Sequence, residues 1–391
     1  MKRLRRFSLG MAMVAVLVAG CTPSISSDQE LIQEDIETEV ETTIIPSMQL
    51  SDSYYKTLVP YKESVARGLV VSNMNTKYNI KEVENGLMRI SQNEFPTDEY
   101  YFQEGQYIDG DMVKYWVARE NQTSEKGPEF QGLNPSSEDK SGNELAPEKK
   151  AEKAPIYLAH VVEQNYLMKT SDNKVTIGGV SIGLALNSVY YYQKEQYGEF
   201  YEQKIDDAKL EVEGKKIAEE VVDRLRQRVG LEEVPIVVAL YKQEPKNSIV
   251  PGTYFAYSVA NKGKNDLGEW KGLNEKFVTF PMNNPEEIYR DMNKKFQNFK
   301  QDIDKYFSNY TSVIGTGFYQ NNTISSLEIE IPIQFYGTSE LIGFTQYLTG
   351  VMLQELPRDL VITIEIKSMN GSEALIKKLP NEEEPFVHIY E

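Results

Sequence analysis

Hydrophobic side chains in the last third of the chain follow two clear periods. From residue 284 to 307 they recur every three or four positions, which predicts a helix that buries one face. Asn284, Pro285 and Glu287 suit the start of such a helix. The predicted buried stripe contains Ile288, Met292, Phe296, Phe299, Ile303 and Phe307.

A strict alternation then predicts a half-buried strand over 327–335. One face would carry Leu327, Ile329, Ile331, Ile333 and Phe335, and the other Glu328, Glu330 and Gln334. Residues 339–355 return to a helical period and stop before Pro357, and 360–367 read as another strand. The residues expected to face inward from this second helix are Leu341, Phe344, Thr345, Leu348, Val351 and Met352.

The middle of the chain shows the same kinds of element. Strands are predicted over 156–167, 175–192 and 234–241, with an edge strand over 255–259. Between them, residues 214–229 form a predicted helix that ends before Gly230. Its apolar positions repeat every four residues, at Ile217, Val221, Leu225 and Val229.

The order strand, helix, proline-containing turn and apolar strand therefore occurs twice, at 175–241 and at 327–367. We interpret this as a degenerate internal repeat, although any two βαβ units share such a pattern. The predicted fold is α+β, with two related lobes over 51–262 and 263–391. Each lobe would be a mainly antiparallel or mixed sheet packed with helices.

Two polar stretches lack an apolar period. Residues 121–155 are rich in Lys, Glu, Ser, Gly and Pro, and are predicted to form a mobile loop of the first lobe. Residues 22–50 contain seven acidic and no basic side chains. The segment 21–50 is therefore predicted to be an acidic, flexible tether.

Residues 1–20 have the form of a secretory signal peptide. Lys2, Arg3, Arg5 and Arg6 precede an apolar run, 11–20, of ten residues, which is half the length that spans a bilayer. The run ends in Val18, Ala19 and Gly20, followed by Cys21, the single cysteine of the chain. This Val-Ala-Gly-Cys sequence is similar to a bacterial lipobox, and the alternative is a chance cysteine after an ordinary signal peptide.

A lipobox predicts that Cys21 receives a diacylglyceryl group and becomes the new N-terminus. Two acyl chains would hold the protein on the outer face of the plasma membrane, with an extracellular body. The formal charge of −17 becomes −21 once the four basic residues of 1–20 are removed. Such a surface repels nucleic acid, so we expect no nucleic-acid partner.

No arrangement of residues predicts catalysis. The chain has two histidines, His160 and His388, and neither belongs to a catalytic or zinc motif. We therefore predict a non-enzyme without cofactor or metal. The alternative is a cell-envelope hydrolase that uses a pair of the 59 carboxylates in a cleft between the lobes.

Tyr190, Tyr191 and Tyr192 form the densest tyrosine cluster. Neighbouring side chains in a strand point to opposite faces, so some of these rings should meet solvent. They are the candidate surface for a peptide or glycan ligand, as in an adhesin or a peptide-binding module. The alternative is that the rings pack along a solvated sheet face.

Several stretches in order along the chain resemble the CamS family, the sex pheromone precursor lipoproteins of staphylococci, bacilli and relatives. They are YKTLVPYKESVARGL (55–69), FPTDEYYFQEGQYIDG (95–110), GLNPSS (132–137), IGLALNSVYYYQKE (182–195), PIVVALYKQ (235–243), YFSNYT (306–311), FYGTSELIGFTQYLT (335–349) and EPFVHIY (384–390).

The resemblance implies that lipoprotein-processing enzymes trim the signal peptide to a short hydrophobic pheromone that affects conjugative plasmid transfer. It also implies a body made of two repeats. The corresponding segment here, 14–20, is smaller than the family's peptide at positions where that peptide has Ile and Phe. It contains Val14, Ala15, Val16, Leu17, Val18, Ala19 and Gly20.

Overall fold

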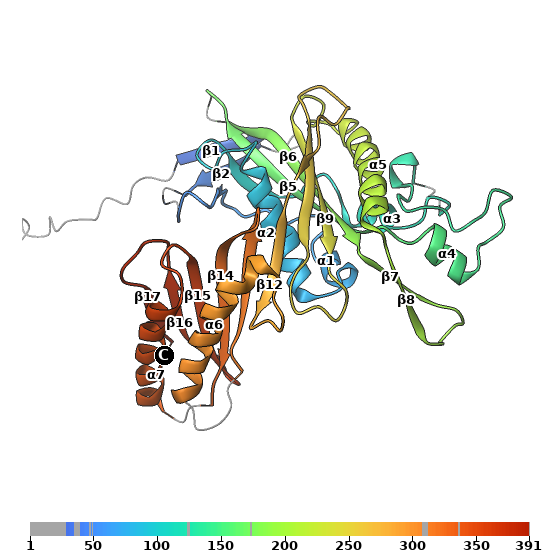
Figure 1. Ribbon diagram of the computed structural model, residues 1–391. Coiled ribbons are helices and arrows are strands. Elements are labelled where there is room, and N and C mark those ends of the chain that lie inside the picture. Colours follow the sequence, from blue (N-terminus) through green and yellow to red (C-terminus); the bar gives the residue numbers. More distant parts are fainter. Residues whose placement is uncertain are drawn as a thin grey trace, which may run out of the picture.

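A computed structural model describes residues 29–34, 40–46, 48, 50–122, 126–172, 174–306, 312–334 and 337–390. Within these residues the chain folds around two mixed sheets and a separate two-stranded hairpin (Figure 1). The helices are α1 (Leu69–Asn73), α2 (Lys77–Ser91), α3 (Gly110–Trp116), α4 (Pro147–Lys153), α5 (Asp207–Arg226), α6 (Glu287–Tyr306) and α7 (Thr338–Glu355), with a 3₁₀ turn η1 (Pro128–Phe130).

The first sheet forms the first lobe and has the strand order β11-β10-β9-β6-β5-β4-β3, with β1 and β2 joined to it through β6. Its strands are β1 (Gln29–Glu34), β2 (Val40–Ile45), β3 (Lys56–Thr57), β4 (Tyr101–Glu104), β5 (Leu158–Lys169), β6 (Lys174–Asn187), β9 (Ile236–Gln243), β10 (Thr253–Ala260) and β11 (Lys271–Gly272). Helix α5 covers one face and α2 the other. Because both faces are buried, β9 is almost continuously apolar.

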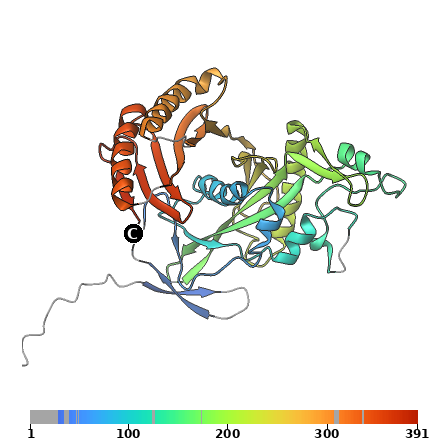
Figure 2. The ribbon, with the colours of Figure 1, turned by 90° about the horizontal axis from the view of Figure 1, so that it is seen from below.

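The second sheet forms the second lobe, in the strand order β12-β13-β14-β15-β16-β17. Its strands are β12 (Glu275–Phe280), β13 (Ile314–Gln320), β14 (Thr323–Pro332), β15 (Val361–Ser368), β16 (Gly371–Lys378) and β17 (Phe386–Ile389). Helices α6 and α7 pack side by side on one face. The other face is turned toward α2 of the first lobe (Figure 2). One buried and one open face explain the strict alternation along β14.

The two lobes repeat one topology. In the first lobe, β5 pairs antiparallel with β6, β6 continues through α5 to the parallel strand β9, and β9 pairs antiparallel with β10. In the second, β13, β14, α7, β15 and β16 follow the same order with the same strand directions. This confirms an α+β fold of two related lobes. The preceding helices differ, since α2 lies on the face opposite α5, whereas α6 lies beside α7.

The structure corrects several of the sequence predictions. Part of the predicted tether pairs as strands, because β1 and β2 form an antiparallel hairpin and β1 also pairs with β6. The β-branched run in 40–45 explains this pairing. Val229 lies beyond the end of α5 and is exposed, and Ile288 is exposed because Tyr289 takes the inward position in the first turn of α6. Phe307 and Phe335 lie outside the described residues.

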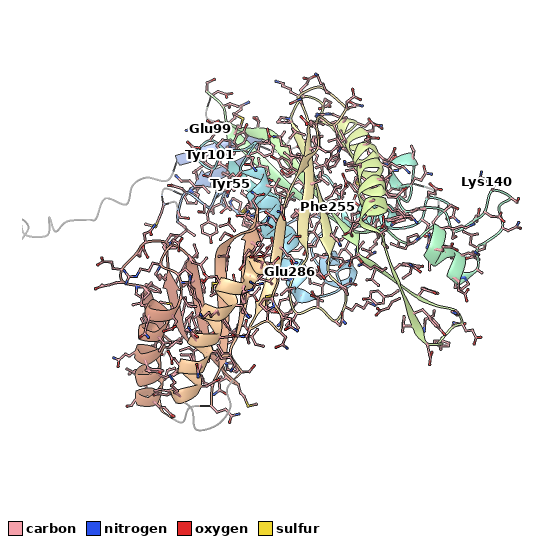
Figure 3. The ribbon with its side chains drawn as sticks, in the orientation of Figure 1. Tyr55, Glu99, Tyr101, Lys140, Phe255 and Glu286 are labelled. Carbon is pink, nitrogen blue, oxygen red and sulfur yellow. The ribbon has the colours of Figure 1, made fainter. Side chains whose placement is uncertain are left out.

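The segment 121–155 contains η1 and α4 and is tied to the sheet through Asn134. The fully buried Asn134 side chain accepts hydrogen bonds from the backbone N–H groups of Tyr157 and Leu158 and donates to the carbonyls of Val117 and Leu158. Lys140 lies at the tip of this segment, away from the sheet (Figure 3). The prediction of a mobile loop missed this anchor.

Replacing Phe296 by alanine should lower the free energy of unfolding of the second lobe by about 3–5 kcal/mol. The ring is fully buried, 5.8 Å from the Phe280 ring and 5.9 Å from the Phe299 ring between centroids, so its removal leaves a cavity. Thermal denaturation followed by circular dichroism measures the loss. Ile288→Ala on the exposed side of the same helix is the matched control, and an equal loss in both variants would contradict the packing described here.

Candidate functional site

A pocket of about 410 Å³ lies in the first lobe between α1, α2, β4 and β5. Helix α2 forms one wall because its apolar side chains, Val83, Leu87 and Ile90, are buried in the core over the sheet. Thr76 caps its N-terminus by accepting a hydrogen bond from the Asn79 N–H. The pocket is consequently built from the exposed flank of a helix that the core holds in place.

Two carboxylates of the pocket hold loops against the sheet. Glu163 accepts hydrogen bonds from the backbone N–H groups of Gln106, Tyr107 and Ile108 at 2.7–3.1 Å. Burial raises the pKa of Glu163, and these N–H groups partly oppose the rise. Glu104 accepts from the Ser64 N–H at 2.6 Å and from the Tyr61 hydroxyl at 2.5 Å. These groups position the pocket rim.

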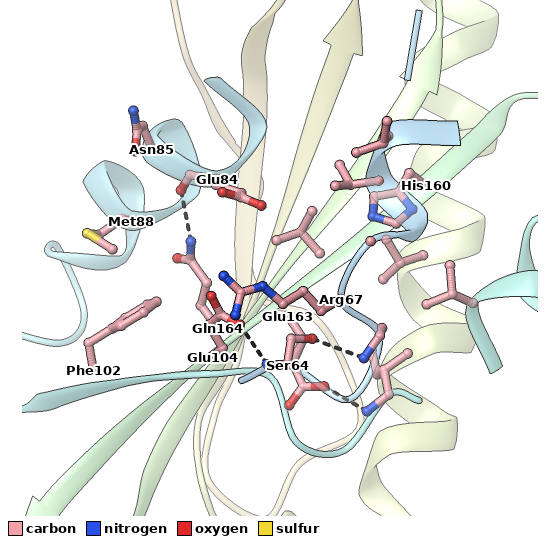
Figure 4. Close-up of a pocket in the computed structure, with 18 residues that line it drawn as sticks. Ser64, Arg67, Glu84, Asn85, Met88, Phe102, Glu104, His160, Glu163 and Gln164 are labelled. Carbon is pink, nitrogen blue, oxygen red and sulfur yellow. Dashed lines mark hydrogen bonds between the residues drawn. The ribbon is translucent and has the colours of Figure 1, made fainter. Parts of the chain in front are cut away.

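Glu84, on α2, differs from them. Its carboxylate makes no hydrogen bond or ion pair to any other residue that the structure describes. Burial raises the pKa of Glu84 first, and the charge of Glu104 raises it further, whereas Arg67 opposes the rise. Figure 4 shows the Arg67 guanidinium between Glu84 and Glu104, with His160 at the other end of the pocket. Glu84 is therefore placed to receive a donor from a ligand.

His160 is buried and uncharged. Burial lowers its pKa to about 4, so the ring is neutral at physiological pH. Its Nδ1 atom lies 3.2 Å from the side-chain nitrogen of Asn73, which can only donate. The ring proton therefore lies on Nε2, which makes His160 a hydrogen-bond donor toward the pocket, in addition to its structural role.

A second hollow, the inter-lobe groove, has a volume of about 760 Å³ and lies on the other flank of α2. Its walls are α2, with Lys77, Lys81 and Glu82, and the open face of the second sheet, with Glu328 and Glu330. Arg89 joins the lobes beside this groove: the guanidinium lies 2.8 Å from Glu82, which lines the groove, and 3.0 Å from Glu275 of β12. Asn85 lines both hollows.

Of the site residues predicted from the sequence, the structure describes the three tyrosines. The segment 14–20 and Cys21 fall outside the described residues. Tyr190, Tyr191 and Tyr192 are half-buried on β7 (Val189–Gln193), which pairs with β8 (Phe200–Lys204) in a hairpin that projects from the first lobe (Figure 1). None of the three lines the pocket or the groove.

The three tyrosine rings already have contacts within the protein. The rings of Tyr190 and Tyr192 stack at 6.0 Å between centroids, and the Tyr190 hydroxyl lies 3.3 Å from Arg119 Nη2. The Lys246 ammonium lies 4.4 Å from the centre of the Tyr191 ring. These contacts agree with the alternative that the rings pack along a solvated face.

The sequence did not single out Glu84, Glu104 or Arg67, because carboxylates are too numerous for any one to be recognised. Among the described residues, no helix is both long and apolar enough to cross a membrane. The same part of the chain holds no group of three or more His, Cys, Asp or Glu side chains placed to bind a metal ion.

The model of one protein family, described as CamS sex pheromone cAM373 precursor, matches residues 61–384. Several chains of solved structures match, two of them as follows. The sex pheromone precursor from Lactobacillus salivarius subsp. salivarius UCC118 is 33% identical, with a TM-score of 0.79, covering 88% of this chain and 98% of its own. The C-terminal domain of the sex pheromone staph-cAM373 precursor from Staphylococcus aureus is 35% identical, with a TM-score of 0.70, covering 82% and 98%. No curated protein matches.

Proposed function

Because the chain belongs to the CamS family of sex pheromone precursors, we propose that it is the precursor of a lipid-anchored extracellular protein and of a short hydrophobic peptide. In this proposal, processing enzymes attach a diacylglyceryl group to Cys21 and cleave before it. The released leader is then trimmed to residues 14–20. The body that remains on the membrane is a non-catalytic binding module.

The observation that carries the proposal is the sequence Val-Ala-Gly-Cys at the end of a ten-residue apolar run that follows four basic residues. The fold supports it. Strand β1 begins at Gln29, eight residues after Cys21. Eight residues span at most about 29 Å, so a lipid on Cys21 would hold the body close to the membrane surface.

The pocket supports a binding role for the body. Glu163 and Glu104 are engaged in holding loops, and Glu84 and the Nε2 atom of His160 remain available to a ligand. An exposed carboxylate without an ion-pair partner, at the rim of a pocket that Val70 and Phe102 also line, favours a ligand with a hydrogen-bond donor and an apolar part.

The peptide VAVLVAG should show weak or no activity in a plasmid-transfer or clumping assay, and Val16→Phe should raise it. The side chains of 14–20 carry no charge or hydrogen-bonding group, so a receptor recognises only shape, backbone and termini. An aromatic ring contributes about 1.5–3 kcal/mol when buried. Dose-response curves of synthetic peptides measure the effect, and Val18→Phe is the matched control for added bulk.

A native peptide as potent as the family's pheromone would contradict this prediction. A Val16→Phe peptide without gain would show that bulk at that position is not the missing element. Mass spectrometry of the culture medium measures separately whether the peptide is released.

A second candidate function is hydrolysis of a cell-envelope substrate in the inter-lobe groove. Burial raises the pKa of Glu82 to about 7 although Arg89 opposes the rise, and the charges of Glu275 and Glu328 add to it. A protonated acid near an ionised carboxylate is the pair that glycosidases use. However, Arg89 already binds Glu82 at 2.8 Å, so we prefer binding. Product release from cell-wall glycan, lost in Glu328→Gln, would favour the hydrolase.

A further inference from the structure

Both walls of the inter-lobe groove carry charges of both signs, but Glu82 on the α2 wall is paired with Arg89, and Lys367 on the sheet wall is paired with Glu330 and Glu365. Lys77 and Lys81 lie one turn apart on α2, and Glu328 and Glu330 lie two residues apart on the open face of β14. Lys77, Lys81 and Glu328 make no ion pair with any other residue in the described part of the chain. Glu330 is paired, at 2.9 Å, with Lys367 of the same sheet. Lys77 and Lys81 on one wall and Glu328 on the other therefore lack an ion-pair partner, and the charge of Lys81 also acts on Glu365 of β15.

Apolar side chains are also exposed in the groove. Large side chains that line it are 40–57% exposed, namely Tyr54, Tyr78, Ile249 and Ile314. They come from both lobes, so neither lobe alone would present this combination. The groove volume of about 760 Å³ lies within the range of known ligand sites.

Contacts of Arg89 and Thr253 join the two lobes beside the groove. The Arg89 guanidinium binds Glu82 of its own helix and Glu275 of β12, and it lies 4.6 Å from the centre of the Phe318 ring of β13. Thr253 of β10 donates a further hydrogen bond to the Glu275 carbonyl. These contacts fix the lobes before a ligand arrives, which lowers the entropic cost of binding.

We infer that the inter-lobe groove binds a short peptide with free termini and uncharged, apolar side chains. The ammonium end would face Glu328, the carboxylate end would face Lys77 and Lys81, and the apolar side chains would cover Tyr78 and Ile314. A ligand of a single charge would be repelled by one of the walls, and a neutral glycan would leave the charges of both walls unmatched. The inference rests on the proposed binding role of the body.

The probe is synthetic VAVLVAG, titrated by calorimetry into the mature lipidated protein, which begins at Cys21, in detergent, with a detergent blank. A peptide of the same sequence with an acetylated N-terminus and an amidated C-terminus has the same side chains without terminal charges. We expect the capped peptide to bind at least tenfold more weakly than the free one. Equal binding of the two peptides, or no binding of either, would overturn the inference.

Two variants locate the site. Lys81→Glu reverses one wall and should weaken binding of the free peptide at least tenfold, whereas Lys140→Glu, at the remote end of 121–155, should leave it unchanged. Circular dichroism checks that both variants are folded. Equal binding by Lys81→Glu and the wild-type protein would place the peptide elsewhere and overturn the inference.

Two further probes test the ligand class. The reversed peptide GAVLVAV should bind about as well as VAVLVAG, because the recognised features are termini and apolar character. Binding of an uncharged N-acetylglucosamine oligosaccharide in place of the peptides would assign the groove to glycans and overturn the inference. Failure of peptide binding would leave lipid anchoring and peptide release unaffected, because those are measured by fractionation and by mass spectrometry of the medium.

Discussion

Replacing Cys21 by alanine should abolish membrane anchoring and leave an unlipidated protein that is either uncleaved or shed. Only the thiol of Cys21 can accept the diacylglyceryl group, since the chain has no second cysteine. Two acyl chains, at about 0.8 kcal/mol per buried CH₂, supply the attachment. The strongly acidic mature chain would not adhere to anionic headgroups without them. Fractionation of cells and medium, followed by immunoblotting, measures the change.

Ser24→Ala, three residues further along the same segment, is the matched control and should stay in the membrane fraction. A Cys21→Ala protein that is still mature and firmly membrane-bound would refute the lipobox interpretation. It would leave the fold and the inter-lobe groove unaffected.

The second large effect concerns Arg226, at the end of α5. Its buried guanidinium donates hydrogen bonds to five backbone carbonyls, those of Leu231, Val234, Ala260, Asn261 and Lys264, at 2.6–3.2 Å. It thereby joins the end of the helix to the turn before β9 and to the loop after β10. Arg226→Met keeps most of the side-chain volume but leaves these carbonyls without their donor. We expect a loss of about 3–5 kcal/mol in the free energy of unfolding of the first lobe.

Urea denaturation followed by tryptophan fluorescence measures this loss. Both tryptophans, Trp116 and Trp270, contact the core of the first lobe, so the signal reports on that lobe. Arg290→Met, on the exposed side of α6, is the control and should change stability by less than about 0.5 kcal/mol. Indistinguishable denaturation midpoints for the two variants would contradict the role assigned to Arg226.

The sequence predicted the elements best where one face is buried and the other is not. Leu327, Ile329, Ile331 and Ile333 alternate with polar residues because α6 and α7 cover only one side of β14, and all four are buried as predicted. All six residues predicted to face inward from the helix over 339–355 are likewise buried in α7. Periodicity is a reliable guide in such elements because burial imposes it.

Periodicity failed at the ends of elements. Ile288 and Val229 fit the four-residue spacing, but one lies on the outer side of the first turn of α6 and the other follows the end of α5. The strands of 29–45 were missed because acidic composition was weighed above β-branched content. An acidic composition shows that a segment is well solvated. Whether the segment forms a strand also depends on a free strand edge with which it can pair, and here β6 provides that edge.

The pocket and the groove could not be predicted, because they are made by residues far apart in the sequence. Glu84 and Glu104 come from different elements, and Lys81 and Glu328 line the same groove only because the lobes are joined through Arg89. The glutamates on β14 were expected to face solvent, and the position of α2 places them in a groove. The position of α2 against the second sheet cannot be predicted from a single sequence.

We propose that Cys21 is the lipidated N-terminus of the mature protein. The most direct test is mass spectrometry of the N-terminal peptide of the protein purified from membranes of its native host. We predict a peptide that begins at Cys21 and carries the added mass of a diacylglyceryl group. An unmodified Cys21, or a mature chain that begins at any other residue, would contradict the account.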